Sequence, residues 1–211
     1  MPVDRSVISA TDALARLRAG NQRYVQNVRS VESMLSHSQR GDIQIQAPFA
    51  IVLGCSDSRA PAEIVFDQGL GDLFVIRVAG NIVAPSQVGS VEFAAQRFGT
   101  QLVVVMGHTH CGAIEATIEA LTGESGAASR DMMSIVNRVR PVVASLVGTD
   151  LARDPVRLRR EAMRANVRAS VNHLRHASDV IEGLAQTGGL MVVGAELDLA
   201  TGEVAFFENP S

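Results

Sequence analysis

The chain alternates between short, continuous apolar runs and longer stretches with helical periodicity. The apolar runs show no polar alternation, which is the pattern of strands buried on both faces of a sheet. Each run stops at a glycine or a polar residue. We expect four such strands, at Phe49–Leu53, Leu73–Ile76, Leu102–Met106 and Leu190–Val193.

Helical stretches precede the first strand and separate most of the others. In these stretches apolar residues return every three or four positions, as on the buried side of an amphipathic helix. Thr11 or Ser9 is a suitable N-cap for the first helix. The expected helices cover Thr11–Gln26, Val88–Phe98, Gly112–Leu121, Met132–Leu146 and Val156–Leu184.

Strands that alternate with helices indicate an α/β fold with a mainly parallel central sheet. Two further runs, Ala195–Leu199 and Glu203–Phe207, flank a turn and predict a hairpin. We therefore expect four parallel strands plus an antiparallel C-terminal edge strand, flanked by helices. We expect a single domain over residues 1–211. Residues 27–46 are polar and weakly patterned, and predict an arm behind the N-terminal helix.

Composition narrows the class of protein. The 211 residues are 46% hydrophobic, which suits one globular domain. The net charge of −3 gives no case for a nucleic acid or an anionic membrane surface as partner. No apolar run resembles a signal peptide or a membrane span, so we expect a cytoplasmic protein. In such a chain two cysteines are more often thiols or metal ligands than a disulfide.

Two motifs follow the first and third strands. They are Cys55-Ser56-Asp57-Ser58-Arg59 and His108-Thr109-His110-Cys111-Gly112. Because the carboxyl ends of parallel strands meet at one edge of a sheet, we expect the two motifs to lie close together.

The residue types in these motifs suit zinc. Zinc takes thiolate, imidazole and carboxylate ligands, and a catalytic zinc commonly keeps three protein ligands and one water. Cys55, His108 and Cys111 supply three ligands for one Zn²⁺ per chain, and Asp57 reaches the metal or lies just outside it. The alternatives are buried cysteines without metal, or a structural zinc, although the chain has no CxxC pair. His110 is a proton shuttle, a rival of His108 as ligand, or a packing residue.

The paired motifs resemble the β-class carbonic anhydrases. The resemblance covers nearly the whole chain. It includes ALxxLxxGNxRYV near the N-terminus, FDQGLGDLFVIRVAGN at 66–81, GSVEFA at 89–94 and the closing hairpin. It implies a lyase that reversibly hydrates carbon dioxide to bicarbonate and a proton, by attack of zinc-bound hydroxide. It also implies a homodimer or homotetramer in which the N-terminal helix and arm, residues 1–46, pack on a partner subunit.

The resemblance also implies roles for individual residues. Cys55, His108 and Cys111 match the family's zinc ligands. Asp57 and Arg59 match its catalytic carboxylate and guanidinium, and in a closed form of the family's site Asp57 itself binds zinc. The open form is favoured here, because Val52 replaces the Trp on which the regulated closed form relies. The positions that match substrate-binding residues are Gln46, Phe74, Phe93 (often Tyr in the family) and Gly112.

Two other functions stay open at this stage. The same scaffold could hydrolyse carbon disulfide or carbonyl sulfide, which are linear like carbon dioxide. A non-catalytic zinc or bicarbonate-sensing protein is the second alternative, although a structural site needs neither Asp57 nor Arg59. Two thiolate ligands leave a zinc-bound water less acidic than three imidazoles would, so we expect activity to rise toward alkaline pH.

Overall fold

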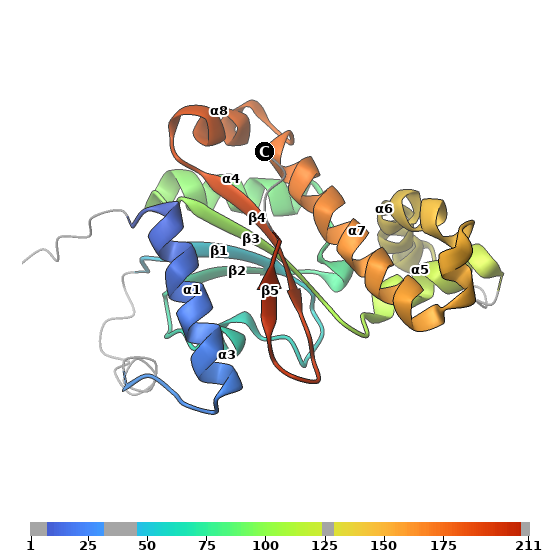
Figure 1. Cartoon of the computed structure of the whole chain (residues 1–211). Coiled ribbons are helices and arrows are strands. Elements are labelled where there is room, and N and C mark those ends of the chain that lie inside the picture. The colour runs from blue at the N-terminus through green and yellow to red at the C-terminus, as the bar shows by residue number, and fades with distance from the viewer. Residues whose placement is uncertain (1–7, 32–45, 124–128, 208–211) are drawn as a thin grey trace, which may run out of the picture.

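The computed structural model describes residues 8–31, 46–123 and 129–207, and its strands form one sheet (Figure 1). The strands lie in the order β2-β1-β3-β4-β5. β1 pairs in parallel with β2 and β3, β3 pairs in parallel with β4, and β5 is antiparallel to β4. The expected sheet with an antiparallel C-terminal edge strand is confirmed. The strands are β1 (Ala50–Gly54), β2 (Leu73–Arg77), β3 (Leu102–His108), β4 (Met191–Leu197) and β5 (Val204–Phe206).

Helices cover both faces of this sheet. On one face α1 and α3 pack over a cluster that includes Leu17, Val65 and Phe66. On the other face α4, α5, α6, α7 and α8 pack over a second cluster, which also contains both cysteines. The helices are α1 (Ala10–Val25), α3 (Ala62–Val65), α4 (Pro85–Phe98), α5 (Gly112–Thr122), α6 (Arg130–Val147), α7 (Pro155–Arg175) and α8 (Asp179–Thr187), with short 3-10 turns η2 (Ala79–Asn81) and η3 (Asp150–Arg153).

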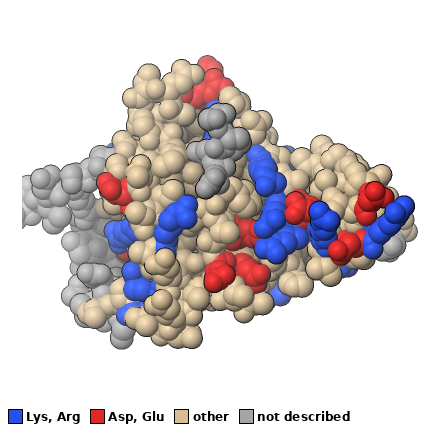
Figure 2. All heavy atoms as spheres, viewed as in Figure 1, with Lys and Arg blue, Asp and Glu red and all other residues tan. Residues whose placement is uncertain are grey.

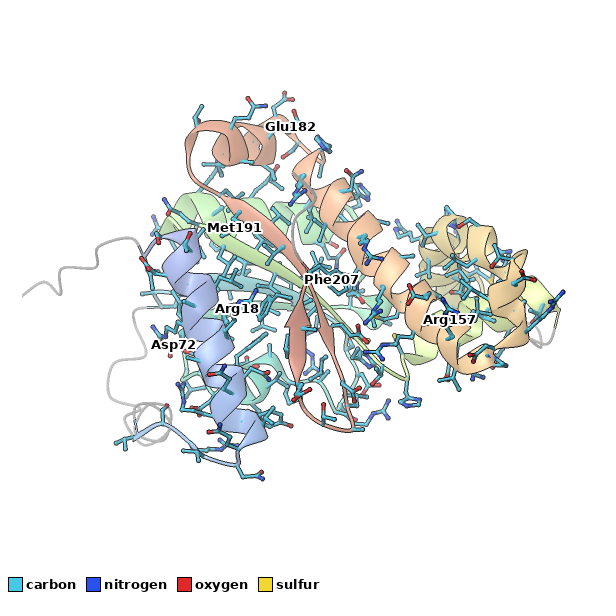
Figure 3. All side chains as sticks on the ribbon, viewed as in Figure 1. Arg18, Asp72, Arg157, Glu182, Met191 and Phe207 are labelled. Carbon is cyan, nitrogen blue, oxygen red and sulfur yellow. The ribbon has the colours of Figure 1, made fainter. Side chains whose placement is uncertain are left out.

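Two expected boundaries are wrong. The helix expected over Val156–Leu184 is two helices, because Ser178 caps α8 by accepting a hydrogen bond from the Ile181 N–H. The strand expected to stop at Val193 continues through Gly194 to Leu197. Gly194 marks a close approach of other groups rather than a strand end. A Cβ at Gly194 would lie 2.9 Å from Val167 of α7 and 2.8 Å from Phe207, which is labelled in Figure 3.

Charged side chains of both signs alternate along the edge that α7 forms (Figure 2). Three arginines of α7 form ion pairs with acidic residues: Arg159 with Glu115, Arg160 with Glu196, and Arg164 with both Glu161 and Glu196. The arginine-rich helix is therefore a salt-bridged surface of the described fold.

Among the described helices, none combines the length and the hydrophobicity that a bilayer crossing requires. The part of the predicted arm at 32–45 lies outside the described residues.

Candidate metal centre

The three expected ligands meet at the carboxyl edge of the sheet. β1 ends directly before Cys55, and its neighbour β3 ends at His108. Cys111 follows after a tight loop and is the N-cap residue of α5. The two sulfur atoms and an imidazole nitrogen lie within 4.8 Å of one another. The side chains are buried, with exposures of 5%, 1% and 4% for Cys55, His108 and Cys111.

The His108 ring is oriented for metal binding. Its Nδ1 lies 2.8 Å from the carbonyl oxygen of Thr109. A carbonyl only accepts, so Nδ1 carries the proton and Nε2 keeps a lone pair. Nε2 is buried and has no hydrogen-bond partner among the described residues. A buried lone pair without a partner is costly, and a metal ion would satisfy it. The donor set of two sulfurs and one imidazole therefore fits zinc.

The pKa values of the two thiols are shifted in opposite directions. A hydrogen bond from Cys111 lowers the pKa of Cys55 to about 4, against the effect of burial. The same hydrogen bond, together with burial, raises the pKa of Cys111 above its usual range. Without metal, Cys55 is therefore the thiolate of the pair. Burial alone would lower the pKa of His108, but the neighbouring Cys55 thiolate and the Thr109 carbonyl raise it above its usual range.

Asp57 and Arg59 form a bidentate pair beside the ligands. Arg59 Nε donates to Oδ1 of Asp57 over 2.9 Å and Nη2 to Oδ2 over 2.8 Å. The backbone N–H of Arg59 also donates to Oδ1. These bonds hold the pKa of Asp57 well below its usual range. Oδ2 of Asp57 lies 3.9 Å from Nε2 of His108, so the carboxylate faces the ligand group.

Two groups that the motifs do not include hold the Cys55 loop. Arg77, at the end of β2, donates from Nε to the carbonyl of Cys55 over 3.1 Å and from Nη2 to that of Asp57 over 2.6 Å. The N–H of Gly80 donates to the sulfur of Cys55 over 3.4 Å. From the sequence, Arg77 had no settled role and Gly80 had none. Their position at and just after the end of the strand next to β1 is the signal that could have found them.

α7 and the C-terminal hairpin hold the other loop. A Cβ at Gly107 would lie 2.6 Å from Val167 and 2.7 Å from Met163, so α7 packs directly on the backbone before His108. The N–H of Thr109 donates to the carbonyl of Leu197 at the end of β4. The ligand His108 is thus fixed from two sides.

The structure separates the two histidines of the second motif. His108 belongs to the ligand cluster, whereas His110 does not. His110 has a φ of 56° in the left-handed region, and its carbonyl accepts a hydrogen bond from Arg59. The exposed Gly112 begins α5, so its N–H is one of those that a helix N-terminus leaves without an intrahelical partner.

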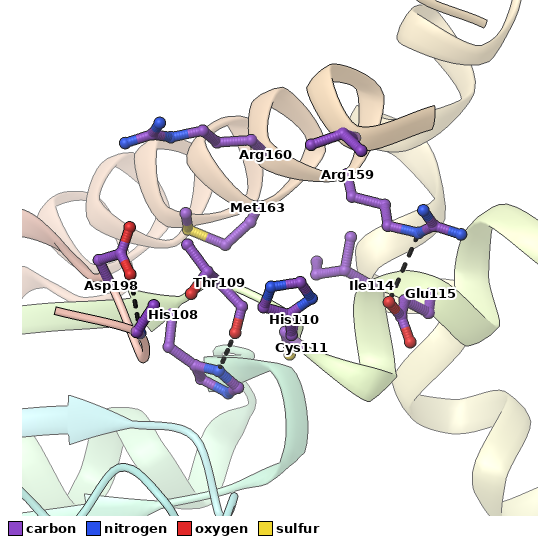
Figure 4. A pocket seen from close by; sticks show the side chains of 12 residues that line it. His108, Thr109, His110, Cys111, Ile114, Glu115, Arg159, Arg160, Met163 and Asp198 are labelled. Carbon is purple, nitrogen blue, oxygen red and sulfur yellow. Dashed lines mark hydrogen bonds and ion pairs between the residues drawn. The ribbon is translucent and has the colours of Figure 1, made fainter. Parts of the chain in front are cut away.

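A cavity of about 240 Å³ adjoins the loop between His108 and Cys111 (Figure 4). Its walls include Thr109, His110 and Met163. Arg159 also borders it and is paired with Glu115 over 3.4 Å. Neither Asp57 nor Gly112 lines this cavity.

Three of the expected substrate residues do not meet the ligands within one chain. Phe74 pairs with Ile51, four residues before Cys55, so its Cα lies roughly 13 Å back along the strands. Phe93 is 53% exposed and packs on Phe74 with ring centroids 6.2 Å apart. Gln46 is exposed ahead of β1, at the end of the strand opposite to Cys55.

Comparison with known proteins gives consistent matches. Residues 50–204 match the family model of carbonic anhydrase. A carbonic anhydrase of Mycolicibacterium smegmatis is 39% identical over 189 residues, which are 89% of this chain and 88% of that protein. Carbonic anhydrase 2 of Mycobacterium tuberculosis is 36% identical over 195 residues, which are 92% of this chain and 90% of that protein.

Solved structures share the fold. A β-carbonic anhydrase of the fungal pathogen Aspergillus fumigatus superposes with a TM-score of 0.73 at 22% identity, over 94% of this chain and 90% of that chain. A tetrameric β-carbonic anhydrase of Sordaria macrospora gives a TM-score of 0.70 at 24% identity, over 78% of this chain and 83% of that chain. At these identities the likeness concerns the fold.

Proposed function

The chain belongs to the β-class carbonic anhydrases, and on that basis we propose that it reversibly hydrates carbon dioxide to bicarbonate and a proton. The observation that carries the proposal is the gathering of Cys55, His108 and Cys111 beside an ionised Asp57. A metal held only for structure usually takes four protein ligands, whereas here three ligands gather and Arg59 pairs with the nearby carboxylate.

Cys55, His108 and Cys111 would hold the zinc ion. When bound, zinc supplies a nucleophile at neutral pH by lowering the pKa of a water molecule. The Thr109 carbonyl keeps the proton on Nδ1 of His108, so that Nε2 faces the ligand cluster. Burial of all three side chains excludes bulk water from the ligand atoms.

Asp57 would orient the reacting water. Its carboxylate accepts hydrogen bonds and, with its pKa held low by Arg59, stays ionised throughout the neutral range. The bidentate pair leaves the carboxylate little freedom to turn. Asp57 thus selects the direction in which the water presents its lone pair, and Arg59 is the residue that positions Asp57.

Gly112 would stabilise the charge that develops on the oxygens of carbon dioxide. An N–H group at the start of α5 has no intrahelical acceptor and points away from the helix. A fixed N–H donor favours negative charge in the transition state without reorganisation.

We further propose that Gln46, Phe74 and Phe93 act in the site of a second copy of this chain. The exposed ring of Phe93 and the distance of Phe74 from its own metal ligands support this assignment. The assembly would be a dimer or a tetramer, with residues 1–46 packed on the partner. We also propose a cytoplasmic location, where reducing conditions preserve the two free thiols as metal ligands.

Stopped-flow measurement of carbon dioxide hydration by the zinc-loaded protein tests the main proposal. We expect turnover that rises from pH 6.5 to pH 9, as two thiolate ligands require. Cys111→Ala, which removes a ligand, is expected to lose zinc and activity together. Wild-type protein with one zinc per chain and no hydration between pH 7 and 9 would overturn the proposal. Parallel assays with carbonyl sulfide and carbon disulfide identify the hydrolase alternative.

A further inference from the structure

The N–H that reaches the sulfur of Cys55 comes from the turn η2 after β2. Gly80 donates this hydrogen bond over 3.4 Å. Its φ of 70° and ψ of 17° lie in the left-handed region, which glycine adopts without strain. Because glycine also has access to many other conformations, the direction of its N–H depends on what holds the turn.

α7 holds this turn through a buried amide. Nδ2 of Asn166 donates to the carbonyl of Gly80 over 2.8 Å. One helical turn later, Oγ of Ser170 donates to the carbonyl of Asn81 over 3.2 Å. The Gly80 N–H and C=O flank the same Cα, so a fixed carbonyl restricts the direction in which the N–H points.

Packing closes the other sides of the turn. A Cβ at Gly80 would lie 3.0 Å from Cβ of Ala113 in α5 and 3.7 Å from Val139 in α6. Side chains of α5 and α6 therefore pack against the glycine. Among the described residues, Asn166 supplies the side-chain hydrogen bond to its carbonyl. The turn meets three helices and the metal ligand at once.

Asn166 is unusual for its place in α7. It is 3% exposed and lies on the buried stripe of the helix with Met163 and Val167. A buried amide costs free energy unless it is hydrogen-bonded, and Asn is a weak helix former. An apolar residue would pack this stripe at lower cost, so packing alone does not account for the amide.

We infer that Asn166 is a positioning residue for the metal centre: by fixing Gly80, it aims the Gly80 N–H at the sulfur of Cys55. The inference rests on the metal centre of the proposed function. An N–H bond to a ligating thiolate withdraws charge from the sulfur and fixes its direction, and loss of such an outer partner typically lowers metal affinity about 10–100-fold. Asn166 lies outside both sequence motifs, and its side-chain hydrogen bond goes to Gly80 and not to a metal ligand.

Substitution of Asn166 in the full chain tests this role without an activity assay. In Asn166→Leu we expect zinc affinity, measured by competition with a chelator, to fall about 10–100-fold. In the cobalt-substituted protein we expect the thiolate-to-cobalt charge-transfer band to move to lower energy, because the sulfur loses an N–H partner. Asn166→Asp keeps the shape of the side chain and in its ionised form has no donor, so at alkaline pH it is expected to shift both readouts in the same direction.

Thr100→Val is the matched control. Thr100 is also buried and donates one 2.8 Å hydrogen bond to a backbone carbonyl, that of Pro48, before β3 and away from the ligands. We expect this variant to lose stability while its zinc affinity and cobalt band stay at the wild-type values. A folded Asn166→Asp or Asn166→Leu protein with wild-type affinity and band energy would overturn the inference. Wild-type protein that binds zinc but does not hydrate carbon dioxide would instead overturn only the proposed function.

Discussion

At the scale of single residues, His108, Cys55 and Asp57 each have a partner that is not a metal ligand. The Thr109 carbonyl selects the tautomer of His108. The Gly80 N–H contacts the sulfur of Cys55. Arg59 keeps the carboxylate of Asp57 ionised. The residue types alone therefore do not define the centre, because these partners also influence the protonation or the direction of its side chains.

Removal of the metal makes the unequal thiol pair measurable. In the metal-free protein the Cys55 pKa of about 4 means that one thiolate persists from neutral pH down to that value. Ultraviolet thiolate absorbance should therefore show one equivalent at pH 7, lost near pH 4. In Cys111→Ala the hydrogen bond to Cys55 is gone, so the pKa of Cys55 should rise and the thiolate should be lost at a higher pH.

Cys55→Ala provides the control for this titration. It should abolish the acid transition, and it should lower the pKa of Cys111, which the bond with Cys55 and burial raise in the wild type. Thiolate absorbance that appears in the metal-free wild type only above pH 8 would contradict the assignment.

At the scale of elements, the contact between α7 and the end of β3 supports the site. Gly107 precedes His108 and has no room for a side chain beneath Met163 and Val167. On two successive turns of α7, Asn166 and Ser170 donate hydrogen bonds to carbonyls of the η2 turn. One helix therefore packs behind His108 and also holds the turn that contacts Cys55.

Gly107→Ala tests this contact. The added methyl group would press on Val167 and Met163, and overpacking of this kind typically costs about 1–3 kcal/mol. Urea unfolding of the metal-free protein measures the change in the free energy of unfolding. Zinc affinity should fall as well, because β3 carries His108.

Gly183→Ala is the opposite control for the same substitution. Gly183 lies inside α8, is exposed, and has no atoms within 4 Å of an added Cβ. Here alanine should stabilise the protein by about 0.5–1 kcal/mol through helix propensity alone. Equal changes in the free energy of unfolding at the two positions would contradict the close contact between Gly107 and α7.

At the scale of the whole molecule, one chain holds the complete ligand set and places other expected site residues elsewhere. Phe74 and Phe93 form an aromatic cluster back along β2 and α4, and Gln46 lies ahead of β1. Along the strands, Phe74 and Gln46 therefore lie away from the carboxyl edge at which the ligands meet. The proposed assembly supplies them from the partner.

Subunit mixing tests this arrangement. Gln46→Ala should slow turnover about tenfold or more without releasing zinc, because a positioning group is lost. Co-expression of Gln46→Ala with Cys111→Ala, under two purification tags, yields mixed dimers. Each has one site with an intact zinc ligand set and an intact Gln46 from the partner, so its activity should exceed the mean of the two separate variants. Activity equal to that mean would place Gln46 in the site of its own chain.

Much of the fold could be predicted because it depends on local pattern. The unbroken apolar runs located the strands to within a few residues, and strand–helix alternation predicted their parallel pairing. The break between α7 and α8 and the passage of β4 through Gly194 were not predictable in this way. They depend on a side-chain cap and on the approach of Phe207 and Val167, which are distant in sequence from Gly194.

The sequence by itself determined the ligand set: Cys55, His108 and Cys111 follow adjacent strands, and parallel strands bring their carboxyl ends to one edge. Only the tertiary structure decided that the Thr109 carbonyl selects the tautomer of His108, and that Gly80, held by Asn166, contacts the thiolate. The physical reason is the separation along the chain of the residues that determine each property. Strand ends follow from local hydrophobicity, whereas the direction of a lone pair or an N–H is set by hydrogen bonds from residues far apart in the chain.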